Sequence, residues 1–521
     1  MHRSRWMVSR RSLCDWSAGA AEAAVRGVSV DRHPGWMPRW PQLLFLGTAL
    51  LYLAGQVVPA RFMGTDEIAF KSAGRHWAKE GVFAAPDLDG FLGPSLEPPV
   101  STVFGVQPPL YPFLYGLFTR VFGFGERVNS CFDAILHCGF GAAAVLLARF
   151  RAPLAPGAAA MAGMIALAVP AGGRPEELAG ILGVLALVPV TGPSVKRMWS
   201  IALGGLALGV SAFAQPVAAV AIALAGTIIV LIENPWRGGS KIIAAWAAAA
   251  MITSSIGLWI VSASLPGAVS QFLFHARLQR GASMLSGFVN ATAYHRQWAL
   301  VFAAGLIACS STAWKKVGAL WWNGAWLPVL VPAAALFLFQ PEKTYYQVVL
   351  VPVLAGALAG SIHTLWALGN RRKERVSVFA VGVLLFCALI LDVRNVAIVL
   401  SLEEDQQVDF NEQLLDQMIP TGSVVIGNDL WPSLANRVQF RSSSHSQVPA
   451  ERIDFVLLTG NGSGRPGQHQ KLQGVYTRLL EGDWVIIHDG ISRRVPEVMG
   501  VPLSRSSWGF GFILYKRAKA G

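Results

Sequence analysis

The sequence is poor in charge, and this shortage narrows the class of protein. Only 14% of its 521 residues are charged and 53% are hydrophobic, whereas a soluble domain carries roughly 25% charged residues. Many apolar runs reach about 16 to 25 residues, the length needed to cross a membrane. The composition therefore argues against a soluble globular chain and predicts a polytopic α-helical membrane protein.

Cysteine is also scarce, with five residues in the whole chain. Cys131, Cys138, Cys309 and Cys387 lie in or beside apolar runs, and residues 401–521 contain none. Cysteines in such surroundings are typical of small buried hydrophobic side chains. Their spacing predicts neither a disulfide framework nor a thiolate metal site.

The net charge of +13 is distributed as in a membrane protein rather than a nucleic-acid-binding protein. Residues 401–521 contain 12 Lys/Arg and 13 Asp/Glu, a balance of −1, so residues 1–400 carry +14. Most of that excess lies in short loops between apolar runs, as expected for cytoplasmic loops. Residues 1–40 hold seven Arg and three acidic residues without the apolar core of a signal peptide. We interpret them as a basic cytoplasmic arm, although Met37 is an alternative start.

Residues 41–400 are predicted to form a transmembrane domain of about eleven helices. Their expected ranges are 42–60, 128–148, 154–170, 178–191, 199–214, 216–232, 242–262, 298–314, 317–340, 345–369 and 376–400. With a cytoplasmic N-terminus, every loop assigned to the cytoplasm is basic, whereas loop 61–127 is nearly neutral, with six Lys/Arg and seven Asp/Glu. The count places the C-terminus on the opposite, outer side.

Residues 401–521 are predicted to form a separate small α/β domain on that outer side. Strand-length apolar runs alternate with helical stretches, a pattern typical of this fold class. The runs are 423–426, 455–458, 484–487 and 510–515, and the helices are 411–418 and 470–480. The glycine-rich segment 460–464 lacks the Gly-Lys-Ser/Thr ending of a phosphate-binding loop, which favours a surface loop.

Two adjacent acids, Asp66 and Glu67, follow the first predicted span and open the outer loop 61–127. The sequence from Asp66 to Lys79 has helical period, with Lys71, Arg75 and Lys79 on one side. The period predicts an amphipathic helix in the membrane interface, with cations available to phosphate or lipid headgroups. Capping of the helix N-terminus, or an ion pair between Glu67 and Lys71, is the alternative interpretation.

Two further outer-face junctions carry charges beside the hydrocarbon, where charges tend to be functional. Arg174 and Glu176 lie in a short turn between two predicted spans, and their alternative is a structural ion pair. Lys343, Tyr345 and Tyr346 lie at another junction and are candidates for holding a phosphate. The alternative there is an aromatic anchor with an extended lysine.

Other candidates lie in loops of the same face. The outer loop 263–297 contains several His and Arg residues, among them Arg296, and these are suited to a phosphate, an anionic acceptor or headgroups. Asp87-Leu-Asp89 has the form of a metal-binding DxD motif, but its Pro/Gly-rich surroundings favour a loop turn. Gln107-Pro-Pro-Leu-Tyr-Pro predicts an extended segment that leads into an aromatic interfacial helix.

The order of these features resembles the GT-C glycosyltransferases. The acid pair after the first span, the amphipathic helix ending at Glu80-Gly81, the Pro-Pro-Leu-Tyr-Pro segment and Phe122-Gly123 follow in that family's sequence. The likeness is strongest to the protein O-mannosyltransferase and aminoarabinose-transferase group, which uses polyprenyl-phosphate sugars. It covers about residues 40–235, and 341–352 resembles the later lipid-phosphate region. Arg174-Pro-Glu-Glu departs from relatives that carry Asp there.

The resemblance implies a transferase on the outer face of a bacterial-type inner membrane. Asp66 matches the catalytic base, Glu67 is its neighbour and Glu176 is the best match for a second acid. Lys343, Tyr345, Tyr346 and three arginines are the candidate lipid-phosphate and substrate ligands; the arginines are Arg75, Arg174 and Arg296. The donor is a polyprenyl-phosphate-linked sugar and the acceptor is a hydroxyl on a lipid, a glycan or a protein. Membrane lipids are expected partners and nucleic acid is not; no cofactor is required, and a divalent metal is compatible with the pattern.

Three other functions fit part of the sequence. A lipid-linked glycan ligase or polymerase would use the Arg/His cluster of 263–297 instead of the acid pair. A transporter or flippase predicts acids or broken helices at mid-membrane and an internal repeat, and the acids here lie at the outer edge. A membrane scaffold that presents the C-terminal domain leaves the acid pair unexplained.

Overall fold

The structure is a computed structural model that describes most of the chain. The described residues are 40–57, 65–88, 98–151, 156–169, 174–191, 197–234, 236–278, 318–339, 344–367, 371–402, 404, 407–427, 432–442, 450–459, 484–490, 497–498, 501–502 and 511–518.

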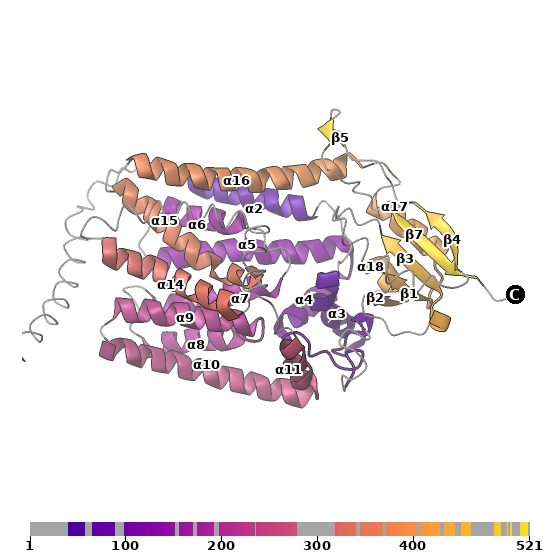
Figure 1. Ribbon diagram of the computed structural model, residues 1–521, viewed down its shortest axis with the longest axis horizontal. Helices are drawn as coiled ribbons and strands as arrows, with labels where there is room; N and C mark the ends of the chain where they lie inside the picture. The colour runs from indigo at the N-terminus through magenta and orange to yellow at the C-terminus, as the bar shows by residue number, and fades with distance from the viewer. Residues whose placement is uncertain are drawn as a thin grey trace, which may run out of the picture.

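A bundle of long, roughly parallel helices forms the larger part of the molecule (Figure 1). These helices are α2 (Trp40–Val57), α5 (Glu126–Arg151), α6 (Pro156–Leu167), α7 (Pro175–Leu187), α8 (Met198–Ser211), α9 (Pro216–Glu233), α10 (Trp236–Ser264), α14 (Gly318–Phe339), α15 (Val351–Ala367) and α16 (Arg371–Leu400). Each overlaps a predicted span, and the remaining predicted span, 298–314, lies outside the described residues. By length and composition, three of the described helices are long and apolar enough to cross a membrane: α5 over 126–150, α9 and α10. Several shorter apolar helices accompany them.

Proline residues mark where several of these helices begin. Pro156, Pro175 and Pro216 are the first residues of α6, α7 and α9. Proline is favoured there because its missing N–H would have no intrahelical acceptor and its fixed φ already suits a helix. Proline also explains a departure from the prediction of one helix over 345–369. The segment begins as the 3₁₀ helix η3 (Thr344–Leu350), and α15 starts afresh with Pro352 in its first turn.

Short helices gather at one end of the bundle, where the loops of the predicted outer face converge (Figure 1). They are α3 (Thr65–Glu80), the 3₁₀ helix η1 (Pro86–Leu88), α4 (Leu110–Phe122) and α11 (Ala268–Leu278). α3 and α4 are the helices expected after the acid pair and after the double proline. α4 buries Tyr111 and Tyr115 and exposes Val121 and Phe122, so its two faces differ as the sequence predicts.

α3 and α4 cross at two glycines. A Cβ on Gly74 would overlap the carbonyl oxygen of Pro112, and a Cβ on Gly116 would lie 2.6 Å from the carbonyl oxygen of Gly74. The two backbones therefore approach each other more closely than any side chain allows. This contact sets the distance between the helices that border the candidate site.

We expect Gly74→Ala to separate α3 from α4 and to destabilise the protein by about 1–3 kcal/mol, the usual cost of overpacking. Thermal unfolding of the purified protein in detergent measures the effect. Gly47→Ala is the matched control, because a Cβ on Gly47 of α2 would meet no neighbour within 4 Å among the described residues. An equal response of the two variants would contradict the close crossing.

A mixed five-stranded sheet lies beyond the short helices, in the C-terminal part of the chain (Figure 1). Its order is β2 (Gln439–Ser442), β1 (Val424–Gly427), β3 (Phe455–Thr459), β7 (Phe512–Arg517) and β4 (Trp484–Asp489). β1 pairs in parallel with β2 and β3, whereas β7 pairs antiparallel with β3 and β4. The sheet is accompanied by α17 (Val408–Met418), α18 (Pro432–Ala435), the 3₁₀ helix η5 (Ala450–Arg452) and a separate pairing of β5 (Glu497–Val498) with β6 (Val501–Pro502).

The α/β pattern predicted for this region is present in the described residues. β1, β3, β4 and β7 lie at the four apolar runs, and α17 covers the predicted helix 411–418. The predicted helix 470–480 and the glycine-rich segment 460–464 fall outside the described residues.

The sheet packs against the first outer loop rather than standing apart. Buried side chains of α3, including Ile68 and Ala73, share one hydrophobic cluster with Val425 and Phe440 of the sheet. The Lys79 ammonium group donates a hydrogen bond of 3.1 Å to the carbonyl oxygen of Asn436. One side of α3 therefore faces the C-terminal part of the chain.

Candidate active site

The acid pair lies in the first turn of α3. Thr65 is the first residue of the helix, and Asp66 and Glu67 follow it. The backbone is helical at these positions, while the two side chains lie outside what the structure describes. Asp66 precedes Phe70 by four residues, so the two positions share one face of the helix.

That face of α3 meets the N-terminus of α7. The guanidinium carbon of Arg174 lies 5.1 Å from the centre of the Phe70 ring. Arg174 Nε donates to Glu176 Oε2 at 3.3 Å, and Gln215 Nε2 donates to Glu176 Oε1 at 3.4 Å. Glu176 is almost fully buried, with 1% of its surface exposed. Two predicted site residues, Arg174 and Glu176, are thus brought together one helical turn from the acid pair.

The third predicted cluster lies partly outside the described residues. η3 carries Tyr345 and Tyr346 and packs against α7 and α9, which brings this segment beside the helix of Glu176. Tyr346 is buried, whereas the side chain of Tyr345 is not described. Lys343 and Arg296 fall outside the described residues. Their roles stay predictions.

The cationic stripe predicted on α3 is wrong for Lys71, which points into the protein. Its ammonium nitrogen lies 2.7 Å from both carboxylate oxygens of Asp133 and donates to Asn129 Oδ1 at 2.7 Å. Lys71 is fully buried and Asp133 has 1% exposure. The helical period placed Lys71 on a polar face, and the partners that cover this face come from α5, about sixty residues further along the chain.

Arg75, a predicted phosphate ligand, is also buried and paired within the protein. Its guanidinium group pairs with the Asp87 carboxylate at 2.5 Å and reaches the carbonyl oxygen of Ala435 at 3.5 Å. Asp87 also accepts a hydrogen bond from Ser72 at 2.5 Å. Arg75 is 5% exposed because η1 and α18 of the C-terminal part lie against it. The guanidinium group of Arg75 therefore connects α3 to the outer loop and to the C-terminal part.

Asp87 consequently has a structural role in the described residues. It belongs to η1 and binds α3 through Ser72 and Arg75, so the DxD segment forms a short turn of 3₁₀ helix at its first acid. Asp89 lies outside the described residues. Within the described ranges, no group of three or more His, Cys, Asp or Glu side chains is arranged to hold a metal ion.

A second buried acid on α7, Glu177, was not among the predicted site residues. Its Oε1 lies 2.5 Å from His137 Nδ1, and both side chains are fully buried. His137 Nε2 is 2.9 Å from the Leu167 carbonyl oxygen, which can only accept, so Nε2 carries a hydrogen. The sequence held one signal for this pair, a histidine in the middle of the apolar run of α5.

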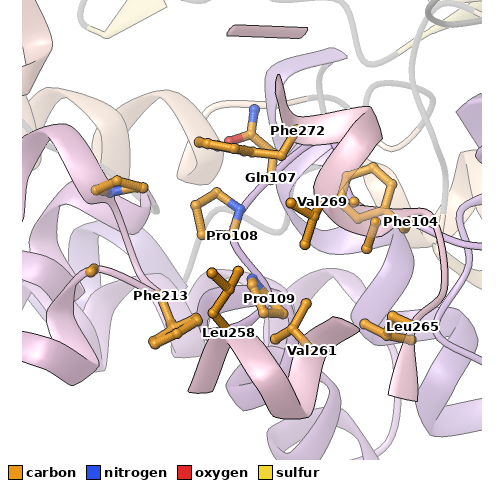
Figure 2. A pocket seen from close by; sticks show the side chains of 14 residues that line it. Phe104, Gln107, Pro108, Pro109, Phe213, Leu258, Val261, Leu265, Val269 and Phe272 are labelled. Atoms are coloured by element: carbon orange, nitrogen blue, oxygen red, sulfur yellow. The ribbon is translucent and has the colours of Figure 1, made fainter. Parts of the chain in front are cut away.

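A cavity of about 130 Å³ opens beside the site. Its walls come from segment 104–109, the turn 212–216, the end of α10 and the start of α11 (Figure 2). Gln107 supplies the polar side chain among the lining residues, and the others are apolar or glycine. Such a surface suits hydrocarbon better than sugar or phosphate.

The walls of this cavity are tied together by hydrogen bonds. The backbone N–H of Leu110 donates to the Phe213 carbonyl oxygen at 3.0 Å. Gln271 of α11 is fully buried, accepts from the Gly105 N–H at 2.6 Å and donates to the carbonyl oxygens of Pro98 and Val103. The outer loop is therefore fixed against α8, α9 and α11 on the side that faces the cavity.

The structure as a whole is similar to ArnT from Cupriavidus metallidurans. The likeness to ArnT bound to undecaprenyl phosphate has a TM-score of 0.57 and covers 93% of this chain and 99% of that chain, at 14% identity. The chain has the fold of ArnT. The apo form gives a TM-score of 0.54 over 91% of this chain and 97% of that chain, also at 14% identity.

The likeness confirms the GT-C fold that the sequence resemblance implies. A weaker likeness, with a TM-score of 0.46 and 15% identity, covers 93% of this chain and 40% of the arabinofuranosyltransferase AftD from Mycobacteria. No family model matches the sequence, and no curated protein matches it.

Proposed function

We propose that this protein is a membrane glycosyltransferase that moves a sugar from a polyprenyl-phosphate donor to a hydroxyl acceptor. The observation that carries this proposal is the position of the acid pair in a chain with the ArnT fold. Asp66 and Glu67 lie in the first turn of α3. Phe70, which shares a face of α3 with Asp66, contacts Arg174, and Arg174 pairs with Glu176 at the N-terminus of α7.

In the proposed reaction, Asp66 acts as the general base. It takes the proton from the acceptor hydroxyl while the oxygen attacks the anomeric carbon, so the configuration there is inverted. The bond between the anomeric carbon and the phosphate oxygen breaks. The polyprenyl phosphate leaves as an anion and needs no proton from the protein. Cationic and phenolic groups stabilise the charge that develops on the phosphate.

The proposed site residues divide into two groups by role. Glu176 is held by Arg174 and Gln215, which suits it to orient the acceptor or the sugar hydroxyls. Lys343 and Tyr345 remain the proposed phosphate ligands, with Arg296 as a further cation from the loop 263–297. Tyr346, which is buried in η3, stays a proposed phosphate ligand with them.

We base the proposed position of the donor on the apolar cavity at the end of the bundle where the short helices lie. The apolar cavity between the outer loop, α10 and α11 suits hydrocarbon. We propose that the donor enters from the bilayer with its tail among the helices and its phosphate near η3. The active site then faces the outer side of a bacterial-type inner membrane, with the N-terminus in the cytoplasm. The acceptor is a hydroxyl on a lipid, a glycan or a protein.

Mass analysis of envelope lipids and glycans tests this function directly. A strain that lacks the protein is expected to lose one glycan or lipid modification and to accumulate the polyprenyl-phosphate sugar that supplies it. Expression of the wild-type protein in the deletion strain is expected to restore the modification. An unchanged profile in the deletion strain would contradict the transferase.

A further inference from the structure

Lys71 is a buried charge that is held by hydrogen bonds and an ion pair. Its ammonium group donates hydrogen bonds of 2.7 Å to Asn129 Oδ1 and Asp133 Oδ2. The second carboxylate oxygen of Asp133 also lies 2.7 Å from the ammonium nitrogen. The face of the Tyr115 ring lies 5.3 Å away. A lysine held by these contacts has one position, unlike the mobile lysines of a protein surface.

This cluster joins the helix of the acid pair to the helix bundle. Lys71 belongs to α3, whereas Asn129 and Asp133 lie one turn apart on the same face of α5. Lys71 follows Glu67 by four residues, so it holds the turn of α3 next to the acid pair. The other end of α3 is attached differently, through the glycine crossing at Gly74 and the contacts of Arg75.

Stability alone is a weak reason for such a cluster. The free energy needed to remove a lysine and a carboxylate from water offsets much of their electrostatic attraction. Well-packed apolar side chains in the same place often stabilise a protein equally well. The cluster adds directional contacts, because its two hydrogen bonds and its ion pair fix both the rotation of α3 and its depth against α5. Apolar packing at the same place tolerates small rotations and shifts.

We propose that Lys71, Asn129 and Asp133 are positioning residues that hold the first turn of α3, and with it Asp66, in the orientation required for sugar transfer. This inference rests on the proposed function for its effect on the reaction. Its effect on the geometry of α3 is independent of that function. None of the three residues is proposed to touch the donor or the acceptor.

The test replaces the whole cluster by apolar side chains, so that no unpaired charge remains. The variant is Lys71→Met/Asn129→Leu/Asp133→Leu, compared with wild type in full-length protein in lipid nanodiscs. The control is Arg437→Gln/Asp416→Asn, which removes an ion pair of 2.6 Å in the C-terminal part, with α3 untouched. We would measure hydrogen exchange in peptides that cover residues 65–70 and 74–80. Thermal unfolding, binding of undecaprenyl phosphate and sugar transfer in membrane vesicles would be measured on the same variants.

We expect the triple variant to fold and to bind undecaprenyl phosphate with an affinity within about twofold of wild type, because none of the three residues is a ligand. Exchange in 65–70 rises by about tenfold or more as that turn opens locally, while exchange in 74–80 stays unchanged. Transfer falls by about tenfold or more, because a displaced base loses its alignment with the acceptor. The control variant behaves as wild type in exchange and transfer.

Three results would overturn the proposal: unchanged exchange in 65–70, an equal rise along the whole of α3, or undiminished transfer from the folded triple variant. Failure of the proposed function has a different signature. Wild type would then bind no undecaprenyl phosphate, and Asp66→Asn would leave the glycan profile unchanged. In that event the exchange data alone decide whether the cluster orients α3, and a selective rise in 65–70 supports it.

Discussion

Asp66→Asn is expected to reduce sugar transfer by about a hundredfold to ten-thousandfold, the usual contribution of a general base. The asparagine amide has nearly the same shape as the carboxylate but cannot take the proton of the acceptor hydroxyl. Because the leaving phosphate needs no acid, loss of the base is the main chemical consequence. Restoration of the missing glycan in the deletion strain, followed by mass spectrometry, measures the effect.

The controls for this variant separate catalysis from folding. An acid in the first turn stabilises a helix by only about 0.3–1 kcal/mol through the helix dipole. Asp66→Asn should therefore insert and unfold much like wild type. Glu176→Gln tests the second acid, and Arg296→Gln tests the rival site in the loop 263–297. Near-normal transfer by a correctly inserted Asp66→Asn would show that the base is another residue, and loss of transfer in Arg296→Gln alone would favour the rival.

The second large effect is expected on stability, from the single substitution Asp133→Leu. Lys71 would then keep its buried charge and lose both carboxylate oxygens of Asp133. Breaking a buried ion pair in this way costs about 3–5 kcal/mol. Thermal unfolding in detergent, together with the yield of membrane-inserted protein, measures the loss.

Comparison with the apolar triple variant identifies the physical cause. If an uncompensated charge is responsible, Asp133→Leu is much less stable than the triple variant, although the triple variant changes more side chains. Equal stability of the two would mean that packing volume, rather than charge, decides the cost. A stable Asp133→Leu variant would contradict the buried pair itself.

Much of the helical architecture followed from hydrophobic length and from proline positions. The apolar runs predicted the helices that became α2, α5 to α10 and α14 to α16, and Pro156, Pro175 and Pro216 mark three of their starts. Alternation of short apolar runs with turns likewise located β1, β3, β4 and β7. These properties are local, because the length of a run and the absence of an N–H act within one segment.

The residues of the candidate site could be predicted only in part from such local properties of the sequence. The order of the acid pair, the amphipathic helix and the double proline singled out Asp66 and Glu67 at the exit of the first span. Charge in a short turn between spans singled out Arg174 and Glu176, which the structure joins. Both inferences used position along the chain relative to a span, which the sequence contains.

The sequence by itself determined that α3 has a charged side and that its first turn carries two acids. Only the tertiary structure decided that this side is covered, with Lys71 against Asp133 of α5 and Arg75 against Asp87 and α18. Helical period assigns a residue to a face, but it does not say which distant segment packs there. Burial and pairing depend on that segment, and so a predicted set of free cations became two buried anchors of the helix that carries Asp66.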